Sequence, residues 1–369
     1  MEVRAKPDLQ AADRVAKNYA ERPLLIYWEV TQACRLACRH CRAEAIPTPQ
    51  PNELSRTESR ALLEQIAAFG APLPHLILTG GDPLERADLF DLIDAAGALG
   101  IPVSITPAAT EKLTREIMEK LKSHGIRSLG LSLDGSDAAR HEAVRGVRGC
   151  FDWTLRAARF AAEVGLPVQV NTLVAAETAE DLPAIFYLLK ENPVMRWSLF
   201  FLIPVGRGRL LKEVSPEWAE ALMNSVYDLS RVAPFEVKTT EAPFYRRVAL
   251  SRMRGERLGS DSLRRTSIHR GFGIRDGHGI MFVSSTGDIY PSGFLPLAAG
   301  NVRSSRIPEV YRSAPLFRKL HDPGRFGGKC GFCEYRIVCG GSRARAFACT
   351  GDPLGSDPLC PYQPNGETV

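Results

Sequence analysis

Short apolar runs alternate with amphipathic stretches from residue 24 to about residue 230. The apolar runs span about four to eight residues and are rich in Ile, Val and Leu, which is typical of buried parallel strands. The stretches between them repeat their apolar residues at helical spacing. The pattern predicts six strands, at residues 24–30, 75–79, 101–106, 128–133, 166–172 and 197–203. It also predicts six helices, at residues 56–69, 88–99, 114–124, 151–164, 181–189 and 216–229.

Local signals mark the ends of several predicted helices. Ser55 and Thr114 each precede a helical stretch and offer a hydroxyl group as an N-cap. Gly70, Gly100 and Gly125 each follow a helical stretch, at the position where glycine commonly ends a helix. These signals support a repeated strand–helix unit.

Repeated strand–helix units predict a parallel α/β fold, either an incomplete barrel or an open doubly wound sheet. Unusual residues follow the predicted strands: three cysteines follow the first, Gly80-Gly81-Asp82-Pro83 the second and Asp134-Gly135 the fourth. One rim of a barrel gathers all of these, whereas an open sheet concentrates function at a single switch point. We therefore expect a partial (β/α)6 TIM-like barrel with a small cysteine-rich C-terminal domain.

The length of 369 residues allows one large core and a smaller module. The expected division is an N-terminal arm at 1–23, the barrel core at 24–232, an Arg-rich connector at 233–285 and the cysteine-rich domain at 286–369.

Composition and charge narrow the function classes. The chain is 44% hydrophobic and 24% charged, as globular proteins usually are. No stretch approaches the ~20 apolar residues that span a bilayer, and the first residues hold no apolar signal region. The net charge of +5 is too small to indicate nucleic acid. We expect a cytoplasmic protein without a membrane or nucleic-acid partner.

The arginines are unevenly distributed. Residues 246–275 contain nine arginines and only two acidic residues, Glu256 and Asp261. One interpretation is a solvated connector. The other is a lid that recognises an anionic, carboxylate-bearing substrate, because guanidinium groups pair bidentately with carboxylates.

Nine cysteines in a cytosolic chain indicate metal binding more than disulfides. Cys34, Cys38 and Cys41 lie on one short loop and can supply three of the four iron corners of a cubane cluster. A structural zinc site needs four ligands, so the missing fourth predicts an iron left open for another molecule. Cys150 stands apart and is expected to be a small buried hydrophobe.

The Cys-x3-Cys-x2-Cys loop, with His40 before its last cysteine, resembles the signature of the radical S-adenosylmethionine (SAM) superfamily. The resemblance implies a 4Fe–4S cluster whose open iron is chelated by SAM. It also implies reductive cleavage of SAM to a 5′-deoxyadenosyl radical, which abstracts hydrogen from a substrate. Gly80, Gly81, Asp82 and Pro83 resemble the family's Gly-Gly-Glu-Pro motif, which contacts SAM. By similar placement, further SAM contacts are expected at Ser132, Arg145 and Asn171.

The C-terminal cysteines resemble the SPASM or twitch extension of the same family. The resemblance implies one auxiliary 4Fe–4S cluster, with zinc as the alternative for four cysteines at this spacing. The expected ligands are Cys330, Cys333, Cys339 and Cys360. Ser292 and Ser342 occupy positions where the family often has ligands of a second auxiliary cluster. Cys349 is left as a spare thiol or an alternative fourth ligand.

Several further segments resemble the heme-biosynthesis branch of the family, which includes Fe-coproporphyrin decarboxylases and heme d1 enzymes. These segments are residues 28–31, 171–172, 204–208, 339–346 and 350–353. The resemblance implies an oxidoreductase that decarboxylates a carboxylate-bearing tetrapyrrole, with the auxiliary cluster as electron acceptor. It further implies an electron donor such as flavodoxin or ferredoxin.

Two alternatives remain open from the sequence. One is a maturase for a ribosomally made peptide, although the 23 residues before the first strand are too few for the leader-binding module that such enzymes often carry. The other is a non-catalytic iron–sulfur or zinc protein. No catalytic residue stands out, and Cys349 and Tyr290 are candidate hydrogen donors by residue type alone.

Overall fold

The computed structural model describes residues 19–257 and 266–364 of the chain. A ten-stranded sheet runs in the order β10-β9-β8-β1-β2-β3-β4-β5-β6-β7. Strands β1 to β8 pair in parallel, whereas β9 and β10 are antiparallel additions. The strands are β1 (Leu25–Glu29), β2 (His75–Thr79), β3 (Val103–Ile105), β4 (Leu129–Ser132), β5 (Val168–Val174), β6 (Arg196–Phe201), β7 (Glu236–Thr240), β8 (Ile280–Val283), β9 (Asp288–Tyr290) and β10 (Gly300–Asn301).

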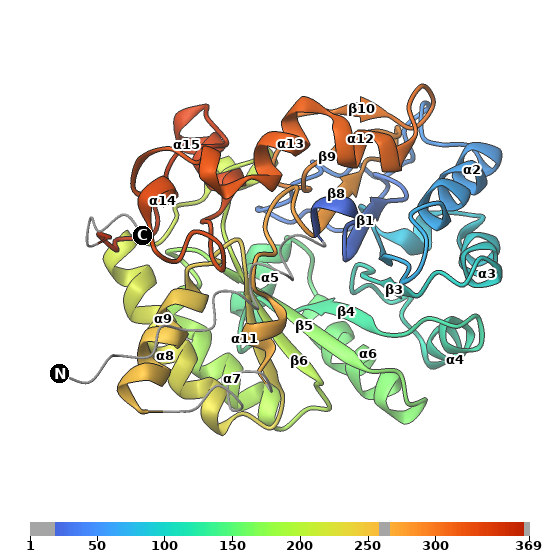
Figure 1. Cartoon of the computed structure of the whole chain (residues 1–369). Helices are drawn as coiled ribbons and strands as arrows, with labels where there is room; N and C mark the ends of the chain where they lie inside the picture. Colours follow the sequence, from blue (N-terminus) through green and yellow to red (C-terminus); the bar gives the residue numbers. More distant parts are fainter. Residues whose placement is uncertain (1–18, 258–265, 365–369) are drawn as a thin grey trace.

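Helices flank the sheet, and the last part of the chain lies across one end of it (Figure 1). The helices of the parallel repeats are α2 (Arg56–Ala67), α3 (Leu89–Ala98), α4 (Arg115–Ser123), α5 (Ala138–Arg145), α6 (Cys150–Glu163), α7 (Leu182–Lys190) and α8 (Pro216–Val232). Those that follow are α9 (Tyr245–Gly255), α11 (Ser267–Arg270), α12 (Ile307–Ser313), α13 (Pro315–His321), α14 (Gly328–Phe332) and α15 (Arg343–Thr350). Among the helices described, none is long and apolar enough to cross a membrane.

The expected parallel α/β architecture is confirmed, and the six predicted strands correspond to β1–β6. Two parallel strands were not predicted. β7 extends the sheet beyond β6, within residues assigned to the Arg-rich connector, and β8 pairs with β1 on the other side. Because β7 and β10 are the two ends of the strand order, the barrel is open rather than closed.

The two faces of each strand differ in character. Trp28 on β1 and Trp197 on β6 are fully buried in the apolar core, and Trp197 packs against Phe186 of α7. These side chains therefore mark the outer face, between sheet and helices. Their neighbours along the strands, such as Tyr27 and Ser198, point to the inside of the barrel because successive side chains alternate.

The predicted helix caps are present. The side chain of Ser55 accepts a hydrogen bond from the Glu58 amide at the start of α2. The Glu58 carboxylate in turn accepts a hydrogen bond from the Ser55 amide. Thr114 accepts from the Ile117 amide at 3.4 Å and caps α4. These local contacts fix the directions in which the helices leave the strand ends.

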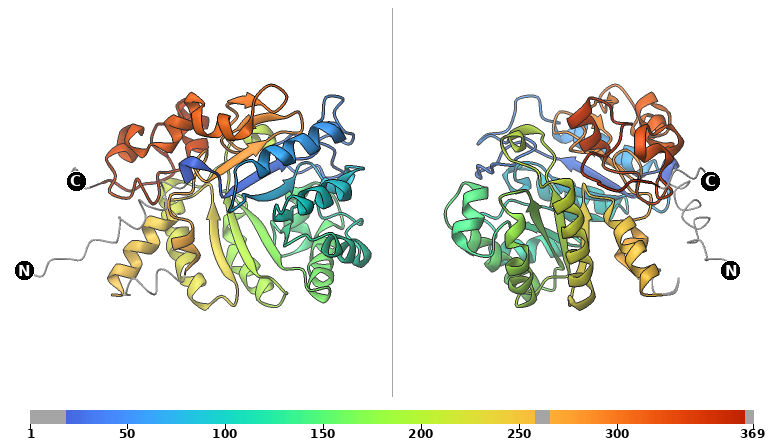
Figure 2. Two further views of the ribbon diagram at one scale, coloured as in Figure 1. Left: turned by 45° about the vertical axis from the view of Figure 1, so that its right-hand side comes forward. Right: turned by 90° about the vertical axis from the view of Figure 1, so that its left-hand side faces the viewer.

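The C-terminal part covers the carboxyl ends of β6 and β7, and both views of Figure 2 show it above the green and yellow strands. Arg345 of α15 is fully buried there. Its guanidinium group donates to the carbonyls of Leu202 (2.9 Å) and Glu241 (2.6 Å) and pairs with Glu213 at 2.5 Å. Arg345 therefore joins α15 to the segments that follow β6 and β7.

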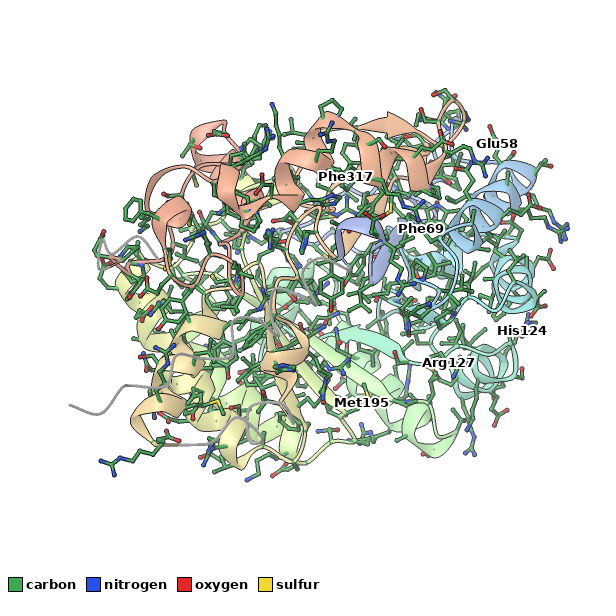
Figure 3. The ribbon with its side chains drawn as sticks, viewed as in Figure 1. Glu58, Phe69, His124, Arg127, Met195 and Phe317 are labelled. Carbon is green, nitrogen blue, oxygen red and sulfur yellow. The ribbon has the colours of Figure 1, made fainter. Side chains whose placement is uncertain are left out.

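An aromatic group makes a second connection between the barrel and the C-terminal part. Phe69 follows α2, and its ring lies 5.9 Å from that of Tyr311 on α12. Phe317 of α13 lies 5.1 Å from the same ring. Figure 3 shows Phe69 and Phe317 close together at this junction.

Replacing Arg345 with Met should lower the free energy of unfolding by about 3–5 kcal/mol, because Glu213 and the buried Asp357 then lose a counterion. Denaturant unfolding of the reconstituted protein measures the change. Arg318→Met on the exposed side of α13 is the control and should stay within ~0.5 kcal/mol of the parent. An unchanged unfolding midpoint in Arg345→Met would contradict this account of the junction.

Candidate functional site

The loop after β1 carries the first three cysteines. Cys34 and Cys38 are buried, and Cys41 is partly exposed. Their sulfur atoms receive polar contacts: the Leu36 amide lies 3.3 Å from Cys34 Sγ, the Ala45 amide 3.4 Å from Cys41 Sγ, and an Arg145 nitrogen 3.6 Å from Cys38 Sγ. Such donors stabilise thiolates bound to iron.

Two other elements hold this loop in place. From α5, the carbonyls of Arg145 and Val144 accept hydrogen bonds from the Ala37 and Arg39 amides at 3.2 and 2.9 Å. From the segment after β6, the Arg207 side chain donates to the Cys38 carbonyl at 2.9 Å. The loop is thus fixed from both sides before any cofactor binds.

Gly206 and Arg207 lie against the cysteine loop, which was not predicted from the sequence. Gly206 has a φ of +52°, and a Cβ atom there would lie 2.5 Å from the Arg42 carbonyl oxygen. The Arg207 amide donates to the Cys41 carbonyl at 3.1 Å. Their only signal in the sequence was the Pro-Val-Gly-Arg-Gly segment itself, which does not reveal that it reaches the cysteine loop.

The Gly-Gly-Asp-Pro turn after β2 lies directly against the chain that leads into the cysteine loop. The Gly81 amide donates to the Thr31 carbonyl at 2.8 Å, and the Asp82 amide to the Ala33 carbonyl at 2.7 Å. A Cβ atom on Gly80 or Gly81 would lie 2.3 Å from a backbone oxygen of this segment. The carbonyls of Gly80 and Gly81 accept no hydrogen bond from the described residues, so they remain available to an ammonium group.

Asp82 has a local structural role as a helix cap. Its carboxylate is fully buried and accepts hydrogen bonds from the amides of Leu84 (3.1 Å) and Ala108 (3.3 Å). Burial raises the pKa of Asp82 to about 6, and these two amides act in the opposite direction. Asp82 thereby ties the turn after β2 to the loop after β3.

The expected SAM contacts on strands lie side by side. Ser132 pairs with Asn171 in the β4–β5 register, and both are partly exposed on the inner face of the sheet. Arg145 is engaged differently, because its guanidinium group pairs with the buried carboxylate of Asp134 at 2.6 Å. Its contacts to Asp134 and Cys38 indicate that Arg145 positions the loop.

Burial also affects the thiols of the loop. It raises the pKa of Cys34 to about 12 and raises the pKa of Cys38, against the opposing effect of Arg145. Cysteines bind iron as thiolates, so assembly of a cluster must release these protons.

The four cysteines expected to bind the auxiliary cluster line one pocket. The pocket is bounded by Arg247, Lys329, Cys330, Cys333, Tyr335, Arg336, Cys339, Gly340, Gly341, Cys360, Tyr362 and Pro364. The Asp357 amide lies 3.4 Å from Cys330 Sγ, and the Gly341 amide lies 3.4 Å from Cys339 Sγ. Arg247 approaches Cys360 Sγ at 3.9 Å. Four thiols with amide and guanidinium donors fit a closed iron–sulfur cluster.

No group of three or more His, Cys, Asp or Glu residues in the described parts of the chain is arranged to hold a metal ion. A cubane differs from a single ion in its demands, since each of its cysteines binds a different iron atom.

The remaining cysteines lie apart from this pocket. Cys349 is exposed, and its sulfur faces Glu213 at 4.0 Å. Cys150 is fully buried against the first cysteine loop, in an apolar cluster with Leu36 and Ala45. The expectation of a small buried hydrophobe at Cys150 agrees with this environment.

The serines at the two family cysteine positions have local roles. Ser342 caps α15 by accepting from the Arg345 amide at 3.1 Å, and its hydroxyl donates to Glu241 at 2.6 Å. Ser292 accepts from the Phe294 amide at 3.3 Å. Both hydroxyl groups are thus used in hydrogen bonds that hold turns.

Comparisons with known proteins agree with this geometry. The family described as the radical SAM superfamily matches residues 28–189. A protein of Oleidesulfovibrio alaskensis named AdoMet-dependent heme synthase is 38% identical over 92% of this chain and 87% of its own length. A protein of Methanosarcina barkeri with the same name is 38% identical over 93% of this chain and 97% of its own length. The chain belongs to the radical SAM superfamily.

Radical SAM enzymes use a 4Fe–4S cluster and SAM, so the non-catalytic alternative is excluded. The resemblance to the heme-biosynthesis branch is confirmed by these relatives. Streptococcus suis SuiB, in the crystal structure with its precursor peptide SuiA, matches with a TM-score of 0.71 over 96% of this chain and 80% of that chain. At 21% identity, this likeness shows the radical SAM fold.

The Arg-rich segment of this radical SAM enzyme is mostly engaged within the protein. Arg247 pairs with Glu220, Arg252 pairs with Asp228, and Arg270 pairs with Glu236. Arg275 is buried and donates to the carbonyls of Gly273 and Leu320. Because Arg247 and Arg275 are buried, these contacts do not match the solvated connector of the first interpretation. The lid interpretation has no support from them, while Arg264 and Arg265 lie outside the described residues.

A methyl group on the Gly-Gly turn should damage the radical SAM site. Gly81→Ala places Cβ against the Ala33 carbonyl, so we expect SAM affinity to fall about tenfold or more, since overpacking costs ~1–3 kcal/mol. Titration calorimetry with the reconstituted enzyme measures this. Gly97→Ala in α3, where a Cβ meets nothing within 4 Å, is the matched control. Equal SAM affinity in Gly81→Ala and Gly97→Ala would disprove the role of the close contact.

Proposed function

We propose that this enzyme oxidatively decarboxylates a propionate side chain of an iron tetrapyrrole. The relatives named AdoMet-dependent heme synthase support this substrate class, because they match nearly the whole chain at 38% identity. The peptide-maturase alternative has weaker support, since SuiB shares the fold at only 21% identity.

The observation that carries the proposal is the placement of two cysteine groups around one end of the sheet. The first loop directly follows the carboxyl end of β1. The domain with the second group packs on the carboxyl ends of β6 and β7 through Arg345 and Ser342. An enzyme that generates a radical and then removes an electron needs two redox sites that face the same substrate space.

The residues for each group follow from their environments. Cys34, Cys38 and Cys41 would hold the cluster that binds SAM, with the carbonyls of Gly80 and Gly81 toward the SAM ammonium group. Ser132 and Asn171 would contact the rest of SAM, and Asp82 and Pro83 would shape the turn. The auxiliary 4Fe–4S cluster would be held by Cys330, Cys333, Cys339 and Cys360.

The proposed chemistry balances in electrons. Cys34, Cys38 and Cys41 would hold a cluster that would supply the one electron needed to cleave SAM to methionine and a 5′-deoxyadenosyl radical. Loss of one hydrogen atom from the propionate carbon next to the ring allows the side chain to release CO2 and one electron. The side chain would then become a vinyl group, and the cluster held by Cys330, Cys333, Cys339 and Cys360 would serve as the electron acceptor.

The same proposal implies an external electron donor of the flavodoxin or ferredoxin type and a reducing compartment. All nine cysteines are free of disulfides, which suits the cytoplasm.

Anaerobic assay with SAM, dithionite and iron coproporphyrin tests the proposed function. We expect 5′-deoxyadenosine together with a porphyrin in which propionate has been replaced by vinyl. Chromatography and mass spectrometry detect both products. Formation of 5′-deoxyadenosine without any change to the tetrapyrrole, but with modification of a peptide, would replace the proposal by the maturase alternative.

Removal of the auxiliary ligands should separate the two redox sites. The quadruple variant with Ala at Cys330, Cys333, Cys339 and Cys360 should keep about four of about eight irons and still cleave SAM, but should form little vinyl product. Iron and sulfide analysis and product assays measure these effects. Cys349→Ala should keep all iron, because its sulfur lies outside the pocket. Loss of iron in Cys349→Ala would identify Cys349 as a ligand.

A further inference from the structure

Lys238 is the central residue of β7, the last strand of the parallel sheet. The strand registers pair Ser132 with Asn171, Asn171 with Ser198, and Ser198 with Lys238. These four residues, here called the inner row, therefore lie side by side across β4 to β7. Lys238 belongs to the same layer of the barrel as the two expected SAM contacts.

The inner row faces the interior of the barrel. Trp197 points outward to α7, so Ser198 and its neighbours in register point inward. Burial raises the pKa of Tyr27 on β1, with Glu241 after β7 acting in the same direction and Arg196 on β6 in the opposite one. Four strands separate β1 from β6 in the sheet, so Arg196 acts on Tyr27 across the interior.

Lys238 has no counterion among residues 19–257 and 266–364. Its closest acidic neighbour on the strand, Glu236, is already shared by Arg196 and Arg270. Glu241 is bonded to Ser342, and burial and Asp276 raise its pKa well above the usual range. The ammonium group of Lys238 makes none of the hydrogen bonds or ion pairs found in these residues.

The surroundings of Lys238 combine burial with access. Burial lowers the pKa of Lys238 to about 8, with Arg196 acting in the same direction and Glu236 in the opposite one. The group still carries its proton at neutral pH. Part of its side chain remains exposed, as do parts of Ser132 and Asn171. Lys238 is therefore a partly desolvated cation that still has accessible surface. A bound anion would offset the desolvation free energy that no counterion offsets now.

Spacing within the inner row distinguishes the possible carboxylates. Neighbouring strands lie ~4.8 Å apart, so the backbone of Lys238 is about 10 Å from that of Asn171 and about 14 Å from that of Ser132. Ser132 lies two residues before Asp134, which pairs with Arg145, and Arg145 contacts Cys38 in the first cysteine loop. Lys238 would therefore lie beside the expected SAM position, on the side where we expect the substrate.

We propose that Lys238 binds a carboxylate of the substrate inside the barrel and thereby selects and orients a propionate-bearing tetrapyrrole. This inference rests on the proposed function and assigns substrate recognition to the inner row instead of the Arg-rich segment. Tyr27, on the opposite wall, is a neutral phenol because burial raises its pKa to about 12, so it leaves the charge of Lys238 uncompensated.

Absorbance titration of the reconstituted, unreduced enzyme with iron coproporphyrin measures the contact directly, without turnover. Lys238→Met should raise the Kd about tenfold or more, because a charge-assisted hydrogen bond is lost. Lys238→Arg should recover part of the affinity. The methyl-ester form of the porphyrin should bind the parent enzyme and Lys238→Met equally weakly. Lys319→Met, an exposed lysine on α13, is the matched control and should bind as the parent does.

A stability measurement separates binding from a structural role. Lys238→Met should keep or raise the Tm, since it removes a buried charge without a partner. Its SAM affinity should equal that of the parent, and a fall in SAM affinity would instead assign Lys238 to the SAM carboxylate and overturn the inference. An unchanged porphyrin Kd in Lys238→Met would overturn this inference alone. Failure of the parent to bind iron coproporphyrin at all would overturn the proposed function with it.

Discussion

The close backbone contact between the ends of β1 and β2 is the constraint on which the active end of this enzyme depends. Two hydrogen bonds, from Gly81 to Thr31 and from Asp82 to Ala33, join the turn after β2 to the segment that enters the cysteine loop. Only residues without a Cβ atom fit at this distance. The contact sets the position of the turn relative to Cys34, so the carbonyls of Gly80 and Gly81 are held in a fixed position relative to the expected cluster ligands. Gly206 also allows a close backbone contact, on the other side of the loop, where the chain after β6 approaches Cys41 and Arg42.

Buried charge has two different uses in the molecule. Arg345, Arg247 and Arg145 are neutralised by carboxylates. Arg345 reaches Glu213, and Arg145 reaches Cys38, across more than a hundred residues of sequence. Such groups hold the C-terminal domain over the barrel and the cysteine loop against α5. Lys238 has no such partner although it lies in the same interior. A partly exposed ammonium group without a counterion can pair with an anion, in agreement with the proposed binding of a substrate carboxylate.

The comparison of prediction and structure shows where patterns of apolar residues succeed and fail. Each of the strands β1 to β6 places at least two apolar side chains in the core on its outer face, so these strands are visible as apolar runs in the sequence. β7 reads Glu-Val-Lys-Thr-Thr, and only Val237 packs in the core. Glu236, Lys238 and Thr240 lie on the opposite face to Val237, toward the barrel interior, and the strand was therefore assigned to a connector. The arginines after β7 were misleading for a related reason, since their partners Glu220 and Asp228 come from α8 and are not apparent from local charge.

The sequence by itself determined the features that depend on short separations along the chain. Three cysteines within eight residues and the Ser55 and Thr114 caps act through neighbouring backbone, so spacing alone revealed them. The tertiary structure decided which distant groups meet. It brought Cys360, and not Cys349, to the pocket of Cys330, Cys333 and Cys339. It also placed Lys238 beside Ser198, while Glu236 forms ion pairs with two arginines. The physical reason is that charge compensation and cluster closure depend on distances in space, which the fold of the whole sheet sets.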